Sequence, residues 1–164
     1  MRMAYTFKTA VEHNGLWTAL WDDPQSGHYG PPPQGEDRPS YRPRSAWLEH
    51  CKVANVDMTR ETDCGRGPVD FKFTRGWTMR GLIEVKHIEN NQFTHGATAQ
   101  LPTYLKGEEA AFGIYLCIGY WDTDFDPDRL AVVQAACAEY STQGKTRIVP
   151  LFVDARPKPS ASKA

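Results

Sequence analysis

The chain has 164 residues, of which 40 % are hydrophobic and 24 % charged, enough apolar content for one folded domain with a short extension. Its formal net charge of -1 excludes attachment to nucleic acid through bulk positive charge alone. The four cysteines form no CxxC pair, and no stretch reaches the roughly 18 apolar residues of a membrane span. We therefore expect no zinc site, no membrane contact and a cytoplasmic protein.

The N-terminal quarter gives conflicting signals. Residues 4–23 combine helical i,i+4 spacing of large apolar side chains with Asn14-Gly15, a pair typical of hairpin turns, and the sequence leaves both readings open. Residues 24–43 are rich in Pro, Gly and polar residues and are typical of a linker or long loop. We predict that residues 1–44 form an extension that ends in this linker.

Residues 45–154 alternate between helix and strand patterns and are predicted to form the folded domain, followed by a flexible tail at residues 155–164. The expected helices are residues 45–54 (beginning at Ser45), 93–110 and 127–142, and the expected strands are 69–74, 82–88, 112–120 and 147–153. The order helix, strand, strand, helix, strand, helix, strand predicts an α/β domain with a mixed sheet flanked by helices.

The strands at 69–74 and 82–88 carry the chemically informative residues. Successive side chains of a strand point to opposite faces, so Asp70 is predicted on one face of the first strand, and Glu84 with Lys86 on one face of the second. Pairing the two strands as a hairpin then brings these three charged side chains together. The opposite, apolar face is expected to hold Val69, Phe71, Phe73, Ile83 and Val85.

This grouping favours divalent-metal chemistry. Two carboxylates held close together repel each other unless a cation or a proton lies between them. Carboxylate oxygens suit Mg²⁺ or Mn²⁺, and such an ion offsets negative charge on a phosphate group. A neighbouring lysine can orient water or stabilise charge that develops in the transition state. The alternative is a solvated strand face with an ordinary ion pair, worth about 0–1 kcal/mol.

The surrounding residues resemble a known signature. The segments GPVDF at residues 67–71 and IEVK at 83–86 resemble the PD-(D/E)XK nuclease signature, an acidic residue after a turn followed by an ExK on the next strand. The segment QLPTYL at 100–105 resembles the QxxxY element of the RecB-like branch of that superfamily. The resemblance covers roughly residues 45–153.

The resemblance implies a restriction-endonuclease-like fold and a set of site residues. It implies Asp70 and Glu84 as metal ligands for Mg²⁺ or Mn²⁺, Lys86 as the catalytic lysine and Gln100 as a supporting catalytic residue. Tyr104, one helical turn after Gln100, shares its face and is a candidate substrate contact.

Two further positions are proposed on weaker signals. The superfamily often has another acidic residue upstream, for which Glu49 and Glu61 both qualify, and Glu61 is favoured as a third metal ligand because it lies nearer the site loop. Arg66, in the turn before Asp70, is a candidate contact to substrate phosphates.

These observations predict a metal-dependent nuclease that hydrolyses phosphodiester bonds, as an endodeoxyribonuclease acting on DNA. A defence or repair system is one setting in which such an enzyme would act. The alternative is an inactive module of the same fold that binds nucleic acid or a partner. Expected partners are nucleic acid and either a larger protein or further copies of the chain. The sequence leaves open the strand state of the substrate, its sequence specificity and any requirement for an activator.

Overall fold

The computed structural model describes residues 2–21, 41–63, 67–77, 79–144 and 146–158, with side chains from residue 47 onward in the second of these ranges. In chain order the elements are α1 (Arg2–His13), η1 (Leu16–Leu20), α2 (Tyr41–Ala54), β1 (Asp57–Asp63), β2 (Pro68–Arg75), β3 (Met79–His87), α3 (Phe93–His95), η2 (Gly96–Gln100), α4 (Leu101–Gly107), β4 (Phe112–Gly119), η3 (Asp122–Phe125), α5 (Pro127–Gln143) and β5 (Arg147–Asp154). The segments η1 and η3 are 3₁₀ turns, and η2 is a π-helical stretch that joins α3 to α4.

The five strands form one mixed sheet in the order β1-β2-β3-β4-β5. Strands β1, β2 and β3 are antiparallel neighbours, whereas β3, β4 and β5 run parallel. Parallel neighbours need a crossover connection, and here the crossovers contain the helical segments α3–α4 and α5. Strand β3 therefore lies between an antiparallel hairpin partner and a parallel one.

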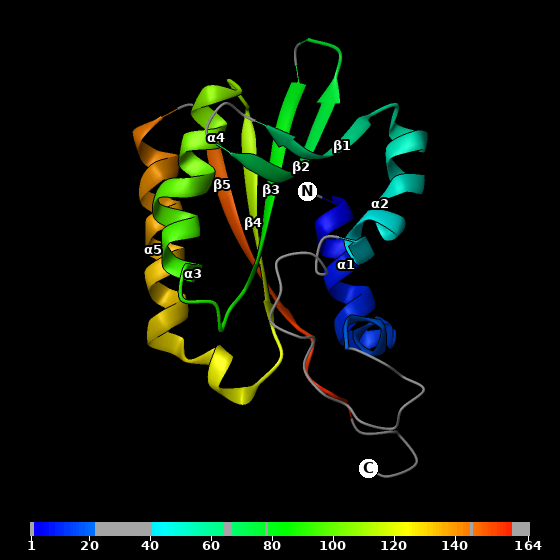
Figure 1. Ribbon diagram of the computed structural model, residues 1–164, viewed down its shortest axis with the longest axis vertical. Helices are drawn as coiled ribbons and strands as arrows, with labels where there is room; N and C mark the ends of the chain where they lie inside the picture. The colour runs from blue at the N-terminus through cyan, green and yellow to red at the C-terminus, as the bar shows by residue number, and fades with distance from the viewer. Residues whose placement is uncertain (1, 22–40, 64–66, 78, 145, 159–164) are drawn as a thin grey trace.

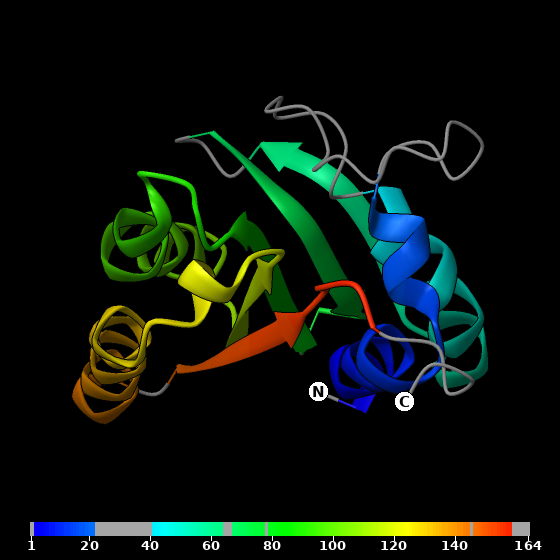
Figure 2. The same ribbon diagram turned by 90° about the horizontal axis from the view of Figure 1, so that it is seen from below.

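Helices cover both faces of the sheet (Figures 1 and 2). On one face α1 and α2 pack over a cluster that includes Phe71, Ile83 and Leu116. On the other face α3, α4 and α5 pack over a second cluster that includes Leu82 and Tyr115. The predicted α/β architecture, a mixed sheet flanked by helices, is confirmed. Among the described helices, none is long and apolar enough to cross a membrane.

Local sequence explains several element boundaries. Helix α5 begins at Pro127, after Asp126 as the N-cap, whose side chain accepts a hydrogen bond from the backbone amide of Arg129 at 2.9 Å. Strand β4 is buried along nearly its whole length, as its continuous apolar sequence predicts for a strand with both faces covered. The β2–β3 hairpin turns at Gly76, whose φ of +58° is a left-handed conformation that glycine adopts without steric cost.

Two predictions about the first half of the chain need correction, and the structure decides between the two readings of residues 4–23. The predicted order lacks a strand, because β1 (Asp57–Asp63) is rich in charged residues and gives no apolar signal; as an edge strand it alternates between exposed and half-buried side chains. Residues Arg2–His13 form a helix, and Gly15 with φ +77° ends that segment without a hairpin. Helix α2 begins at Tyr41, so Ser45 is not its N-cap. The predicted linker at 24–43 lies mostly outside the described residues.

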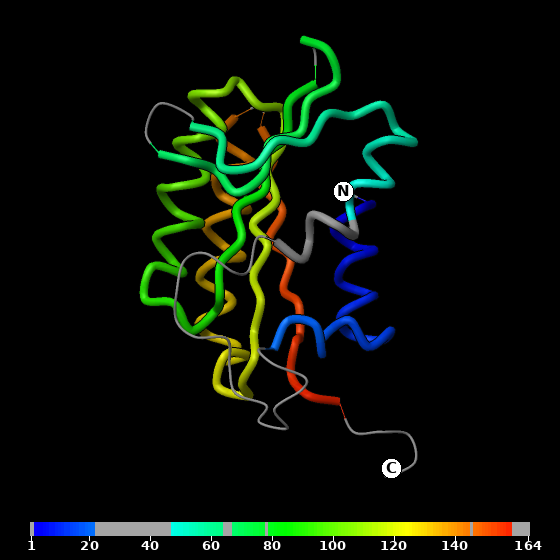
Figure 3. Tube along the Cα trace, turned by 45° about the vertical axis from the view of Figure 1, so that its right-hand side comes forward, coloured from blue at the N-terminus to red at the C-terminus, as the bar shows by residue number. Residues whose placement is uncertain are grey.

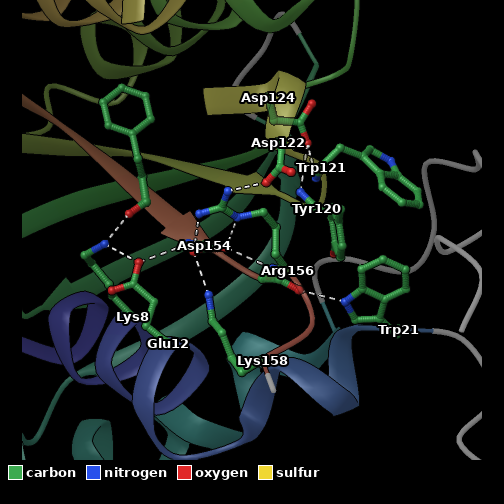
Figure 4. A network of polar contacts seen from close by, with 12 residues as sticks. Lys8, Glu12, Trp21, Tyr120, Trp121, Asp122, Asp124, Asp154, Arg156 and Lys158 are labelled. Atoms are coloured by element: carbon green, nitrogen blue, oxygen red, sulfur yellow. Dashed lines mark hydrogen bonds and ion pairs between the residues drawn. The ribbon is translucent and has the colours of Figure 1, made fainter. Parts of the chain in front are cut away.

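The N-terminal helix is tied to the last strand by a polar network (Figure 4). The carboxylate of Glu12 accepts a hydrogen bond from the backbone amide of Asp154 at 3.0 Å. The indole of Trp21 donates to the carbonyl oxygen of Ala155 at 2.7 Å. The guanidinium of Arg156 binds the carboxylate of Asp154 at 2.8 Å. Partial burial acts to raise the pKa of Asp154, but hydrogen bonds from Arg156 and Lys158 outweigh it and hold that pKa below its usual range. The segment expected as an extension thus packs on the same core as the sheet.

The fully buried Phe7 tests this integration. We expect Phe7→Ala to lower the free energy of unfolding by about 3–5 kcal/mol, because it removes a ring that contacts Trp47 edge-on in the core. Tyr5→Ala is the matched control: Tyr5 is half exposed on the same helix, and its loss should change stability by about 0.5 kcal/mol at most. Urea unfolding measures both, and equally small effects would show that α1 is not part of the cooperative unit.

Candidate active site

The structure brings Asp70, Glu84 and Lys86 together on the sheet face covered by α3, α4 and α5. Strands β2 and β3 pair with Phe71 opposite Ile83, so Asp70 and Glu84 occupy the next positions along the two strands. Leu82 belongs to the core cluster beneath these helices. Because side chains alternate along a strand, Glu84 and Lys86 point to the same face as Leu82. The Lys86 ammonium lies 3.2 Å from Glu84 Oε1.

Asp70 stands at the point where the β2–β3 pairing ends. Its Oδ2 accepts a hydrogen bond from the backbone amide of Val85 at 2.7 Å, so the side chain satisfies an amide beyond the last paired residues. This bond fixes the Asp70 carboxylate directly beside the strand that carries Glu84 and Lys86. The site is therefore held by backbone geometry as well as by side-chain contacts.

The alternation predicted for β2 breaks at this same position. Phe71 and Phe73 pack in the cluster beneath α1 and α2, as expected, but Val69 packs in the cluster on the other face. Strand β1 pairs with β2 on the side away from β3, and there Glu61 of β1 lies opposite Asp70, between the paired residues before and after it. Glu61 has a φ of +47°, which is unusual in a strand. A kink at this point explains why strand periodicity alone misplaces Val69.

Glu84 is the most constrained member of the site. Its side chain is 3 % exposed, and its Oε2 is buried with no hydrogen-bond partner. In the sheet it pairs with Tyr115 of β4, a fully buried residue that adds to the apolar surroundings. A buried carboxylate oxygen without a donor is costly, so this atom is poised to accept a cation or a proton.

Burial shifts the acidity of both carboxyl groups, and repulsion by Asp70 adds to the shift at Glu84. Burial, followed by the nearby Asp70 charge, raises the pKa of Glu84 to about 8 against the opposing effect of Lys86. Burial also raises the pKa of Asp70, although the hydrogen bond from Val85 and the charge of Lys86 oppose the shift. The pair therefore resists carrying two negative charges unless a further positive charge joins Lys86.

The available donors fit a divalent cation held by few protein ligands. Among the described residues no group of three or more His, Cys, Asp or Glu side chains is gathered as a metal site. Asp70 and Glu84 alone would hold the ion, with the unpartnered Oε2 of Glu84 as the most available oxygen. Mg²⁺ is commonly bound through one or two carboxylates, its remaining positions being taken by water and substrate phosphates.

The two candidate third acids differ in position. Glu61 lies close enough to Asp70 to raise its pKa, but its carboxylate is largely exposed and binds Arg60 Nη2 at 2.7 Å. Glu49 projects from α2, which packs on the opposite face of the sheet, and it pairs with Lys52. Glu61 thus lies nearer the site than Glu49, but no third acid among the described residues is gathered with Asp70 and Glu84 as a metal site.

Gln100 and Tyr104 form a separate pair at the edge of the site. Gln100 Nε2 donates to Tyr104 Oη at 3.1 Å, one helical turn apart. A Cβ built on Gly67, whose φ is +119°, would lie 3.0 Å from Tyr104 Oη, so the pair abuts the turn that leads into β2. No hydrogen bond among the described residues joins Gln100 to Asp70, Glu84 or Lys86.

Three further points concern Arg66, Lys72 and the helical segment that ends at Gln100. Arg66 lies outside the described residues. Lys72, which strand alternation places on the same side of β2 as Asp70, forms an ion pair with Glu108. The π-helical stretch η2, which ends at Gln100, was not predicted, since a single extra residue per turn leaves no clear mark on helical periodicity.

Comparison with known proteins yields one family. A family model described as a domain of unknown function, DUF8371, matches residues 1–122, which include α1 and every site residue named above. No curated protein matches the chain.

The raised pKa of Glu84 predicts how stability depends on pH in metal-free protein. Between the ordinary value of 4.5 and the folded value of about 8, the folded state holds a proton that the unfolded state has lost. The free energy of unfolding should therefore fall as pH rises through this window. Glu84→Gln should make the free energy of unfolding depend less on pH, because only the smaller contribution of Asp70 would remain. At the high-pH end of the window this variant should be more stable than the wild type.

Urea unfolding in EDTA at several pH values measures this slope. Glu49→Gln, which changes an exposed carboxylate on α2, is the matched control and should keep the wild-type slope. A wild-type protein whose stability is constant across the window would contradict the burial argument.

Proposed function

The chain belongs to the DUF8371 family, whose function is unknown, and we propose from the site itself that it is a metal-dependent nuclease of the PD-(D/E)XK type. The proposal includes a restriction-endonuclease-like fold and hydrolysis of phosphodiester bonds in DNA. Its support is the pattern of acidic and basic residues on β2 and β3 together with their placement on one sheet face.

One observation carries the proposal: the buried carboxyl group of Glu84 lies beside the half-buried carboxyl group of Asp70 and next to a lysine. Keeping two such groups out of water is unfavourable for folding unless a ligand offsets the cost. Pairs of acids with shifted pKa values are more frequent at functional sites, because catalysis uses charged groups in positions that are unfavourable for folding.

Each residue has a distinct proposed role. Asp70 and Glu84 would hold Mg²⁺ or Mn²⁺, which, when bound, lowers the pKa of water and offsets charge on the phosphate. Lys86 places its ammonium beside Glu84, where it can orient the attacking water or stabilise the negative charge that develops on the phosphate. The hydrogen bond from Val85 orients the Asp70 carboxylate.

Gln100 and Tyr104 would act as positioning residues. Their hydrogen-bonded pair lies against Gly67, and so braces the turn three residues before Asp70. A shift of that turn would move the Asp70 carboxylate relative to Glu84. Tyr104 is 5 % exposed, so its role toward the substrate is indirect through this contact.

The alternative is an inactive relative that binds nucleic acid or a partner protein through the same fold. The state of Glu84 favours the enzyme over this alternative. A binding module gains nothing from a buried Oε2 without a donor, and replacement by an apolar side chain would remove the cost. Retention of the full set of Asp70, Glu84 and Lys86 is what a catalytic site requires.

Paired variants separate metal binding from chemistry. Asp70→Asn should weaken metal binding and abolish cleavage together, because it removes a negative oxygen ligand. Lys86→Ala should leave metal binding intact, or slightly tighter, and lower the cleavage rate by about 100-fold or more, because its charge acts mainly in the transition state. Calorimetric metal titration and cleavage of labelled DNA in Mg²⁺, Mn²⁺ or EDTA measure the two effects.

Lys52→Ala, on the opposite face of the sheet, is the matched control and should behave as wild type in both assays. Full cleavage by Lys86→Ala, when the wild type requires metal, would remove Lys86 from the mechanism. Absence of metal-dependent cleavage of both single- and double-stranded substrates by the wild type would favour the inactive module.

A further inference from the structure

The turn of the β2–β3 hairpin carries a large exposed aromatic ring. The side chain of Trp77 is 89 % exposed, in contrast to Trp21 and Trp47, which are buried in the core. The hairpin turn projects from the end of the sheet beyond the neighbouring helices (Figures 1 and 3). This exposed indole adds no buried area to the core and stays available for contact with another molecule.

One cationic side chain lies against this ring, and a second is exposed nearby in the sequence. The guanidinium carbon of Arg80 lies 5.5 Å from the centroid of the Trp77 ring, and Arg80 Nη1 donates to the carbonyl oxygen of Glu108 at 2.9 Å. Arg80 is thereby anchored against one side of the indole. Arg75 is exposed beside the turn, and residues 73–80 include Arg75 and Arg80 and no carboxylate, whereas Lys72 is paired with Glu108.

We propose that Trp77 is a stacking platform for an unpaired base of a nucleic-acid strand, with Arg75 and Arg80 contacting its phosphates. The inference rests on the proposed function and names its substrate class: nucleic acid with accessible bases, such as a single strand, an end or a loop. An indole stacks on any base that is free of its own neighbours, whereas a continuous duplex offers no base face. The positive hairpin complements the phosphate charge.

The position of the ring relative to the acidic site is consistent with one continuous strand. Five residues of β2 separate Asp70 from Arg75, a distance of about 17 Å at about 3.3 Å per residue. A strand with its scissile phosphate at Asp70 and Glu84 would therefore place a base several nucleotides away against Trp77. The two sites would then act on different parts of the same substrate.

The test is binding measured without cleavage. Fluorescence anisotropy in EDTA would follow a labelled single-stranded DNA, the same strand with abasic positions throughout, and a blunt duplex. We expect Trp77→Ala to bind the single strand about tenfold more weakly, as removal of one base–aromatic stack predicts. Trp77→Phe, which keeps an aromatic face, should recover most of the affinity. On the abasic strand wild type and Trp77→Ala should bind alike.

A matched control removes an exposed apolar side chain elsewhere. Val53 is 90 % exposed on α2, and Val53→Ala should bind every strand as wild type does. Unchanged single-strand affinity in Trp77→Ala, or an equal loss on the abasic strand, would overturn the proposal. Trp77-dependent binding to anionic phospholipid vesicles without binding to single-stranded DNA would also overturn it, in favour of a membrane surface.

The outcome is separable from that of the proposed nuclease activity. Trp77-dependent binding by a protein that never cleaves would support the stacking site and leave the inactive module as the function of the acidic site. Metal-dependent cleavage with single-strand binding that is indifferent to Trp77 would support the nuclease and overturn the stacking site.

Discussion

The repulsion between the half-buried Asp70 carboxyl group and the buried Glu84 carboxyl group is the constraint on which the proposed site depends. Desolvation disfavours the charged form of both groups, and the charge of Asp70 adds to this effect at Glu84. Lys86 offsets only part of this, since the pKa of Glu84 remains raised in its presence. The fold must therefore hold the pair in place by other means, and metal-free protein carries an energetic cost that a bound cation would relieve.

The sheet supplies that restraint. Strand β3 pairs with β4 at Glu84 and with β2 as far as Ile83, the residue before it, so the backbone at Glu84 has little freedom. The carboxylate of Asp70 binds the amide of Val85 just beyond the β2–β3 pairing. Helices on both faces of the sheet cover the part of the β2–β3 hairpin that carries Asp70 and Glu84, and so limit the access of water to these acids. The turn of the hairpin, with Trp77, stays exposed to water. One hairpin thus joins a buried site to an exposed surface.

Sequence patterns predicted the strands of this hairpin and the grouping of Asp70, Glu84 and Lys86 because alternation is a local property of the chain. They missed β1, whose edge position needs no apolar face, and they misplaced Val69 because the kink opposite Glu61 depends on pairing with another strand. They also gave no sign that α1 packs on β5, a contact between the two ends of the described chain. Such long-range contacts leave no periodic signal in a single sequence.

Proton release on metal binding is the most direct test of the central claim that Asp70 and Glu84 form a divalent-cation site. Calorimetric titration with Mn²⁺ at neutral pH, in two buffers that differ in ionisation enthalpy, counts the protons released. The account predicts that binding displaces a proton from the acid pair, and that Glu84→Gln binds Mn²⁺ more weakly and releases none. Absence of Mn²⁺ binding, or binding with neither proton release nor sensitivity to Glu84→Gln, would contradict it.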